Sequence, residues 1–307
     1  MKIILKTIII LLIAASVKAG GFDDLGNSAR VFSLGGAYTA VADAPYSLFY
    51  NPAGIYRLKK YAVSTTYSNL YPGVQDDKLN YFSLSGIVPI SFIGELGIGG
   101  TFLNTSLWQE NIIYGTYAKE VYNSFAVGGS VKLLRWSAEA APGESALSYV
   151  GITFDAGIHY TLKNIFKGSD LRFGLAAQNI TEPSIASNGS ADAKLPMILA
   201  AGLAYVSSNF DYLIALDLVK EGDSYYVKTG AEFLGLRQEV LGLNTAFLVR
   251  AGYNGTVNDT PFSRSGINGG FGIEVNNLII DYAYAYPLEL TEVGGRHKVS
   301  LSYNFNF

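Results

Sequence analysis

The chain has 307 residues, of which 49% are hydrophobic, 13% aromatic and only 15% charged, with a formal net charge of −3. A soluble domain usually carries about 25% charged residues, so this composition is typical of a surface that faces something other than water. The apolar content excludes a disordered chain, and the absence of Cys excludes disulfide scaffolds, thiolate metal sites and cysteine nucleophiles.

Residues 1–19 have the pattern of a secretory signal peptide. Lys2 and Lys6 precede an apolar run over residues 7–17, and Val17-Lys18-Ala19 matches a small-residue cleavage site. The run is shorter than the ~20 residues of a membrane-spanning helix, so a membrane anchor is the weaker alternative. Cleavage after Ala19 would remove three of the 22 basic residues. The remaining acidic chain argues against a nucleic-acid partner.

Residues 20–58 lack strand alternation and are rich in small and turn-forming residues. Examples are Gly35-Gly36-Ala37, Asp43-Ala44-Pro45 and Asn51-Pro52-Ala53-Gly54. Short helical turns around 37–42 and 46–50 would let the segment pack inside a barrel. We predict that it forms an N-terminal luminal plug, or hatch.

Residues 59–307 show the period-two alternation of transmembrane strands. The last segment alternates large apolar residues at 299, 301 and 303 with Lys298, Ser300 and Ser302. In hydrocarbon only helices and closed barrels satisfy the whole backbone, so an all-β, antiparallel transmembrane β-barrel is predicted. About fourteen strands are expected, beginning near Lys60, Leu79, Gly94, Asn111, Ser124, Tyr149, Leu171, Met197, Asp211, Tyr225, Ala246, Gly266, Leu278 and Arg296.

The connections predict the orientation of the barrel, because bacterial barrels have longer loops outside and shorter turns on the periplasmic side. The expected outer loops are 137–148, 181–196, 254–265 and 287–295, and the expected periplasmic turns are 90–93, 121–123, 207–210 and 276–277. Residues 235–245 are predicted as a long connection on the periplasmic side, which is the one exception.

Charged residues fall on the inward phase of the expected strands, at Asp155, Arg172, Asp217, Arg250 and Asp281 among others. They are either a polar path or latch, or simply hydrated and paired lumen residues. A buried charge needs a partner. We therefore expect Arg30 and Asp43 of the plug to bond to wall groups of opposite sign.

The third expected strand contains Gly97, Gly99 and Gly100. Glycine weakens a strand and permits kinks, so these positions are candidates for a lateral opening in the wall. The alternative is that they only leave room for the plug.

The chain resembles the PorV/PorQ family over nearly its whole length after residue 19, and two parts carry most of the resemblance. The N-terminal part has Arg30, the run from Gly35 to Asp43, and Phe49-Tyr50-Asn51-Pro52-Ala53-Gly54; the C-terminal part has Asp281-Tyr282-Ala283-Tyr284 and the run from Arg296 to Phe305. That family is related to the FadL-type outer-membrane transporters, which carry an Asn-Pro-Ala element in a luminal hatch. The resemblance implies a fourteen-stranded barrel whose hatch motif comprises Arg30, Gly35, Gly36, Asp43, Asn51, Pro52, Ala53 and Gly54.

The sequence contains no nucleophile elbow, phosphate-binding loop or zinc-protease motif, so no catalytic, metal or cofactor residues are predicted. Asp155 and His159 share a face but are four residues apart along a strand, about 13 Å, too far for a catalytic dyad. Aromatic residues near strand ends are expected to form interfacial girdles. These are Tyr61, Tyr67, Tyr114, Tyr117, Tyr160, Tyr205, Tyr253, Tyr282, Tyr286 and Phe307.

The expected location is the bacterial outer membrane, with membrane lipid and, through the C-terminal Phe307, the barrel-assembly machinery as partners. The expected function is a FadL-like, non-enzymatic barrel that passes small hydrophobic compounds by passive diffusion. Its outer loops are short and rather polar compared with those of fatty-acid transporters. The alternative is a PorV-like barrel that docks secretion substrates or secretion machinery.

Overall fold

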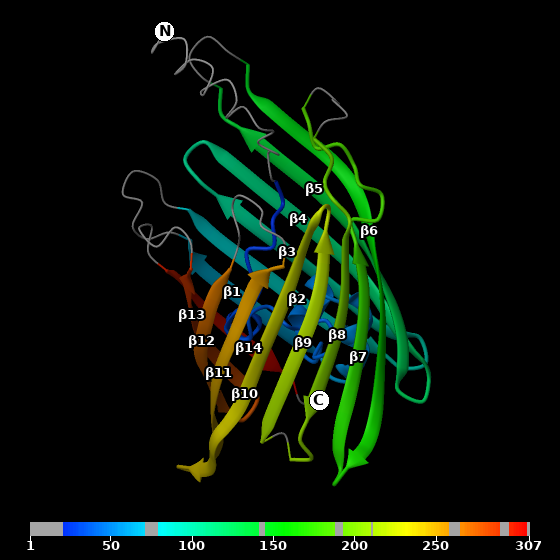
Figure 1. Cartoon of the computed structure of the whole chain (residues 1–307), viewed down its shortest axis with the longest axis vertical. Helices are drawn as coiled ribbons and strands as arrows, with labels where there is room; N and C mark the ends of the chain where they lie inside the picture. Colours follow the sequence, from blue (N-terminus) through cyan, green and yellow to red (C-terminus); the bar gives the residue numbers. More distant parts are fainter. Residues whose placement is uncertain are drawn as a thin grey trace.

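The computed structural model describes residues 21–70, 79–140, 145–187, 193–209, 211–257, 265–288 and 295–305. Fourteen antiparallel strands close into one barrel in chain order, with β1 paired to β14 (Figure 1). The strands are β1 Ala62–Asn69, β2 Asn80–Ile90, β3 Gly94–Asn104, β4 Trp108–Tyr122, β5 Phe125–Ala138, β6 Leu147–Phe166, β7 Ser169–Gln178, β8 Ile198–Val206, β9 Tyr212–Glu221, β10 Ser224–Val240, β11 Leu243–Thr256, β12 Gly266–Val275, β13 Leu278–Pro287 and β14 Arg296–Asn304.

The predicted barrel and its strand count are confirmed, and each strand begins within three residues of its expected start. The alternation that predicted them is also the burial pattern. On β9, Leu216 and Leu218 are exposed on the outer face, whereas Asp217 between them is 1% exposed inside. Apolar side chains outside and polar side chains inside are the arrangement of a barrel surrounded by lipid.

The prediction of a long connection over residues 235–245 is wrong. β10 continues to Val240 and β11 starts at Leu243, so Leu241 and Gly242 form a two-residue turn. Both turn residues have positive φ, 52° and 78°, as the favoured two-residue hairpin turns require. The pairing shifts by one residue between Leu234 and Leu236. This bulge hid the alternation in the sequence.

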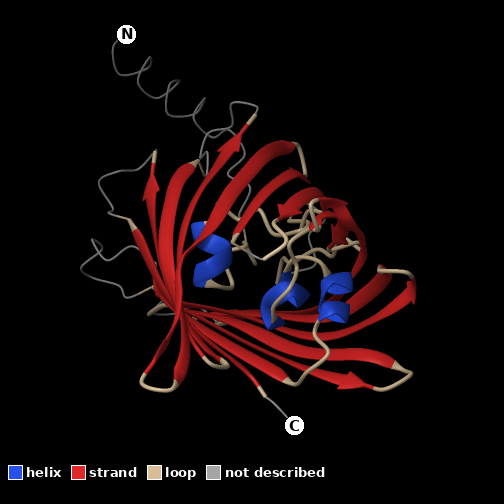
Figure 2. Cartoon of the chain, turned by 90° about the horizontal axis from the view of Figure 1, so that it is seen from below, coloured by secondary structure: helices blue, strands red, loops and turns tan. Residues whose placement is uncertain are grey.

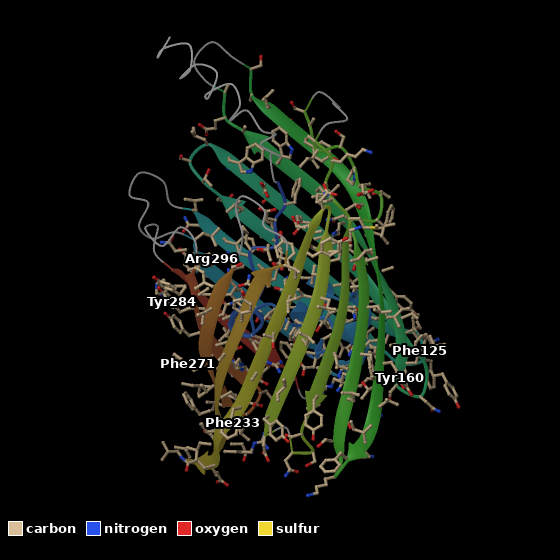
Figure 3. All side chains as sticks on the ribbon, viewed as in Figure 1. Phe125, Tyr160, Phe233, Phe271, Tyr284 and Arg296 are labelled. Atoms are coloured by element: carbon tan, nitrogen blue, oxygen red, sulfur yellow. The ribbon has the colours of Figure 1, made fainter. Side chains whose placement is uncertain are left out.

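Aromatic side chains stand on the outer face near the strand ends, as Figure 3 shows for the neighbouring Phe125 and Tyr160. Tyr67 and Tyr286 are about half exposed there. Tyr114 departs from the expected girdle because it points inward, is 6% exposed and packs edge-on against Phe49 of the N-terminal segment.

Residues 21–58, called here the N-terminal segment, lie inside the barrel, where Figure 2 shows the helices enclosed by the ring of strands. The segment contains the α-helix α2 Ala29–Ser33 and the 3₁₀ helices η1 Pro45–Phe49 and η2 Pro52–Arg57. Helix α2 was not predicted, and residues 38–42 form only one turn, closed by a hydrogen bond from Ala42 N to Tyr38 O (3.2 Å).

Among the described residues, no helix has the length and apolarity needed to cross a membrane. The expected signal peptide and Phe307 lie outside the described residues.

A charge placed on the outer wall tests the lipid-facing assignment. Leu216 lies mid-strand on the outer face of β9, so Leu216→Arg should cost about 2–4 kcal/mol of unfolding free energy in vesicles. The matched control is Leu241→Arg, because Leu241 is 96% exposed in the β10–β11 turn and should change stability by less than about 1 kcal/mol. Urea unfolding measures both, and equal effects would contradict the lipid-facing assignment.

Candidate functional site: the N-terminal segment and the lumen

The N-terminal segment folds locally through polar caps and glycine turns. The Ser28 side chain accepts a hydrogen bond from Arg30 N and so caps α2. Gly35 and Gly36 follow the helix with φ of 66° and 80°, values that favour glycine after a helix end. Asn51 caps η2, and Pro52 occupies its first turn. These motif residues therefore stabilise the helix ends and turns of the segment itself.

Asn51 also joins the segment to the wall. Its side-chain Nδ2 donates to Thr39 O (2.9 Å) and to Ile158 O of β6 (3.0 Å), and its Oδ1 accepts from Ala53 N (3.1 Å). Because the residue is fully buried, removing the amide would leave several backbone groups without partners. One side chain thus fixes two turns of the segment and one strand.

Eight wall strands present a glycine to the N-terminal segment. A Cβ atom added at Gly128 would lie 2.6 Å from Ala53 N, and one at Gly230 would overlap the backbone of Leu34. We call this set the glycine belt; it comprises Gly97, Gly128, Gly157, Gly174, Gly202, Gly230, Gly252 and Gly270. At six of these glycines, all except Gly97 and Gly270, the added Cβ would meet backbone atoms of the segment. There the backbone of the segment contacts the backbone of the wall directly.

Six side chains of alternating charge form a continuous chain across the lumen. In order they are Arg172 of β7, Asp43 and Arg30 of the N-terminal segment, Glu232 of β10, Arg250 of β11 and Asp281 of β13. We call them the luminal ion chain. Three guanidinium groups balance three carboxylates, so the luminal ion chain has no net charge when all six groups are ionised.

The expected pairing of Arg30 and Asp43 with wall groups of opposite sign is found. Arg30 binds Glu232 through two parallel hydrogen bonds, from Nε to Oε2 (2.7 Å) and from Nη2 to Oε1 (2.8 Å). Asp43 accepts from Arg30 Nη1 (2.6 Å) and from Arg172 Nη1 (3.1 Å). Two-pronged Arg–carboxylate pairs are strong and fix geometry. The ion chain therefore fastens the segment to β7 and β10.

The charges in the segment keep each other ionised. Burial alone would raise the pKa of Asp43, but Arg30 and Arg172 outweigh it and hold that pKa well below its usual value. Burial opposes the charged form of Arg30, while Asp43 and Glu232 raise its pKa well above the usual value. Both groups are thus charged at neutral pH.

The ion chain continues in the wall through Arg250. Its Nε donates to Glu232 Oε2 (2.6 Å) and its Nη1 donates to Asp281 Oδ1 (2.7 Å).

The other two expected inward charges lie elsewhere in the lumen. Asp217 accepts the backbone N–H groups of residues 38 and 39, both at 2.8 Å. Asp155 pairs with Lys132 (2.7 Å) and does not share a partner with His159, whose Nε2 contacts Ala40 O (2.8 Å).

The glycines of β3 lie in an unbroken strand. Gly97, Gly99 and Gly100 each pair with a residue of β2 and a residue of β4, so no opening separates β3 from its neighbours in this structure. Cβ atoms at Gly97 and Gly99 would instead lie 3.4 Å or less from Leu48 of the N-terminal segment. The structure thus shows these two glycines making room for the segment.

A pocket of about 100 Å³ lies in the lumen against the N-terminal segment, at the strand ends that carry the longer loops. Its lining includes Phe32, Tyr50, Ile198, Asp217, Tyr226 and Lys228. Two larger hollows, of about 670 and 730 Å³, lie in the wall over β6–β10 and β2–β6. Small outward residues such as Ala201 and Gly115 stand there among large apolar ones.

Sequence reasoning missed several residues that hold the segment. Asn27 donates its N–H to the Tyr50 hydroxyl (2.8 Å) and accepts at its carbonyl from Thr66 and Ser83, at 3.0 and 2.9 Å. Gln178 of β7 donates to Phe49 O and Tyr50 O. The described residues hold no group of three or more His, Asp or Glu placed to bind a metal ion.

The fold and this site define a class: a closed antiparallel barrel with an apolar outer face and a folded N-terminal segment inside its lumen. Solved FadL-type hydrocarbon channels have a similar fold. The CymD monoaromatic hydrocarbon channel matches with a TM-score of 0.65 and 14% identity over 94% of this chain and 99% of that one. The Pseudomonas putida toluene transporter TodX matches at 0.59 and 12% over 92% and 98%. A Pseudomonas aeruginosa FadL homologue matches at 0.58 and 13% over 91% and 98%.

No protein-family model matches the chain, and no curated protein matches it significantly in sequence. At these identities the likeness to the channels is one of fold.

Removing the central carboxylate should loosen the segment. Asp43→Asn leaves Arg30 and Arg172 without the charge between them, and breaking a buried ion pair costs about 3–5 kcal/mol. We expect a higher ion conductance in planar bilayers while the barrel stays folded. The control is Lys59→Gln, which breaks a pair with Glu95 whose Lys side chain is 58% exposed. If Asp43→Asn conducts no more than the wild type, the luminal ion chain does not hold the segment in place.

A methyl group added to one glycine of the glycine belt should also loosen the N-terminal segment. A Cβ at Gly252 would overlap Gly35 N and Leu34 C, so Gly252→Ala must displace the segment and should raise conductance and lower thermal stability. Gly115→Ala on the outer face of β4 is the matched control, since its Cβ meets nothing within 4 Å. If the two variants behave alike, the belt is not a close contact.

Proposed function

We propose that the chain is an outer-membrane barrel of the FadL type through which small hydrophobic compounds pass by passive diffusion, and that residues 20–58 act as its plug. The supporting observation is the likeness of fold, over nine-tenths of the chain, to channels described as carrying monoaromatic hydrocarbons and toluene. The apolar outer face fits a barrel embedded in lipid. Export through a signal peptide at residues 1–19 belongs to the same proposal, as does assembly signalled by Phe307.

The plug explains how such a barrel can admit a ligand without leaking. Fourteen strands enclose more space than wall side chains fill, and an N-terminal segment seated on the glycine belt occupies it. The luminal pocket lies against that segment on the side of the longer loops. A compound that reaches the pocket from outside is then held at the plug, and the plug must shift for the compound to leave.

A second role, docking of secretion substrates or machinery as in PorV-like proteins, is favoured by one observation. The turns at the end with the short connections carry large apolar residues in the open: Phe92 is fully exposed and Leu241 is 96% exposed. Single exposed apolar residues are common on protein surfaces, and a contact with another protein requires these turns to act as one contiguous apolar patch. A stoichiometric protein that copurifies with the chain after gentle extraction, and is lost in Leu241→Ser, would favour docking over transport.

Uptake of toluene by proteoliposomes tests the transport proposal. Ala200 faces the lumen and lines the pocket, whereas the next residue, Ala201, faces outward. We expect uptake several-fold above protein-free liposomes for the wild type and for Ala201→Trp. Ala200→Trp should fall to the protein-free rate because the larger ring fills the pocket. Wild-type uptake no faster than that of protein-free liposomes would exclude the proposal.

A further inference from the structure

The luminal pocket combines a small apolar surface with charged groups. Phe32, Tyr50 and Tyr226 supply aromatic surface, and Ile198 and Val219 supply aliphatic surface. Its volume of about 100 Å³ is smaller than the ~150 Å³ of a cavity known to hold benzene, so it limits a ligand to a single ring at most. A long acyl chain would not fit within it.

Most polar groups around the pocket are already occupied by the protein. Asp217 Oδ2 accepts two backbone N–H groups of the N-terminal segment, whereas its buried Oδ1 has no hydrogen-bond partner among the described residues. Asp24 accepts from Gly26 N (3.0 Å), and Asn268 donates to Phe32 O (2.8 Å). Glu221, Asn254 and Arg296 also have partners. These groups complete the structure and leave little for a ligand.

Lys228 is different. Its ammonium group makes no hydrogen bond or close ion pair with any part of the chain that the structure describes, and the charge with which it interacts is the Asp217 carboxylate. It lies on β10, directly across from Asp217 of β9 and Asn254 of β11. Its side chain passes Gly36, where an added Cβ would lie 3.2 Å from Lys228 Cδ. Gly36 of the hatch motif therefore leaves the space through which this lysine reaches the pocket.

We propose that the pocket binds a small aromatic compound carrying an anionic oxygen group, such as a carboxylate, with the ring against Phe32 and Tyr226 and the anion on Lys228. This inference rests on the proposed function and names the ligand class for it. This ammonium has no hydrogen-bond acceptor among the described residues, and it gains a charge-assisted hydrogen bond from such a ligand. A plain hydrocarbon would desolvate the ammonium and give it no partner.

Binding and uptake of benzoate and toluene, measured side by side on the full chain, test the proposal. The wild type should take up benzoate in preference to toluene. In Lys228→Met, which keeps the length of the side chain, the benzoate-to-toluene ratio should fall about tenfold or more, and Lys228→Arg should restore much of it. The control is Lys220→Gln on the outer face of β9, which should keep the wild-type ratio.

Three outcomes are distinguishable. A wild-type ratio that does not favour benzoate, or the same ratio in Lys228→Met and Lys220→Gln, overturns the assignment of an anionic ligand while leaving hydrocarbon transport intact. Uptake of neither compound overturns the proposed function and this inference together. Heat-dependent migration on a gel shows whether each variant is folded, and Lys228→Arg supplies the second test if Lys228→Met is not.

Discussion

The structure depends on the direct contact between the backbone of the N-terminal segment and the backbone of the barrel wall. A barrel in lipid must close to pair its strands, and closing fourteen strands leaves a lumen wider than the wall side chains fill. The glycine belt lets the segment approach the wall more closely than any other residue would permit. Everything else in the lumen, including the pocket, takes its place from that contact.

Charge complements this close fit. Backbone contact alone would hold the segment through many small interactions, whereas the luminal ion chain adds specific, directional bonds from β7 to β13. Buried ion pairs contribute little net stability but are costly to break. Such a chain favours one position of the segment over its alternatives.

The barrel was predictable because alternation has a period of two and each strand repeats it independently. β14 could be read residue by residue, whereas the bulge near Gly235 concealed the end of β10. The interior was only partly predictable. That Arg30 and Asp43 need partners follows from burial, but the choice of Glu232 and Arg172 depends on how far the barrel curves between β7 and β10. The glycine belt left a signal, since Gly157 falls in phase with the inward Asp155 and His159; its meaning requires knowing that a chain lies opposite.

The most direct test of the account is the single-channel conductance of the unaltered chain in a planar bilayer, compared with a chain lacking residues 21–58. The account predicts almost no steady conductance for the full chain and a large, open-pore conductance once the N-terminal segment is removed. A full chain that conducts as freely as the shortened one would show that the segment does not close the lumen, and the central claim would fall.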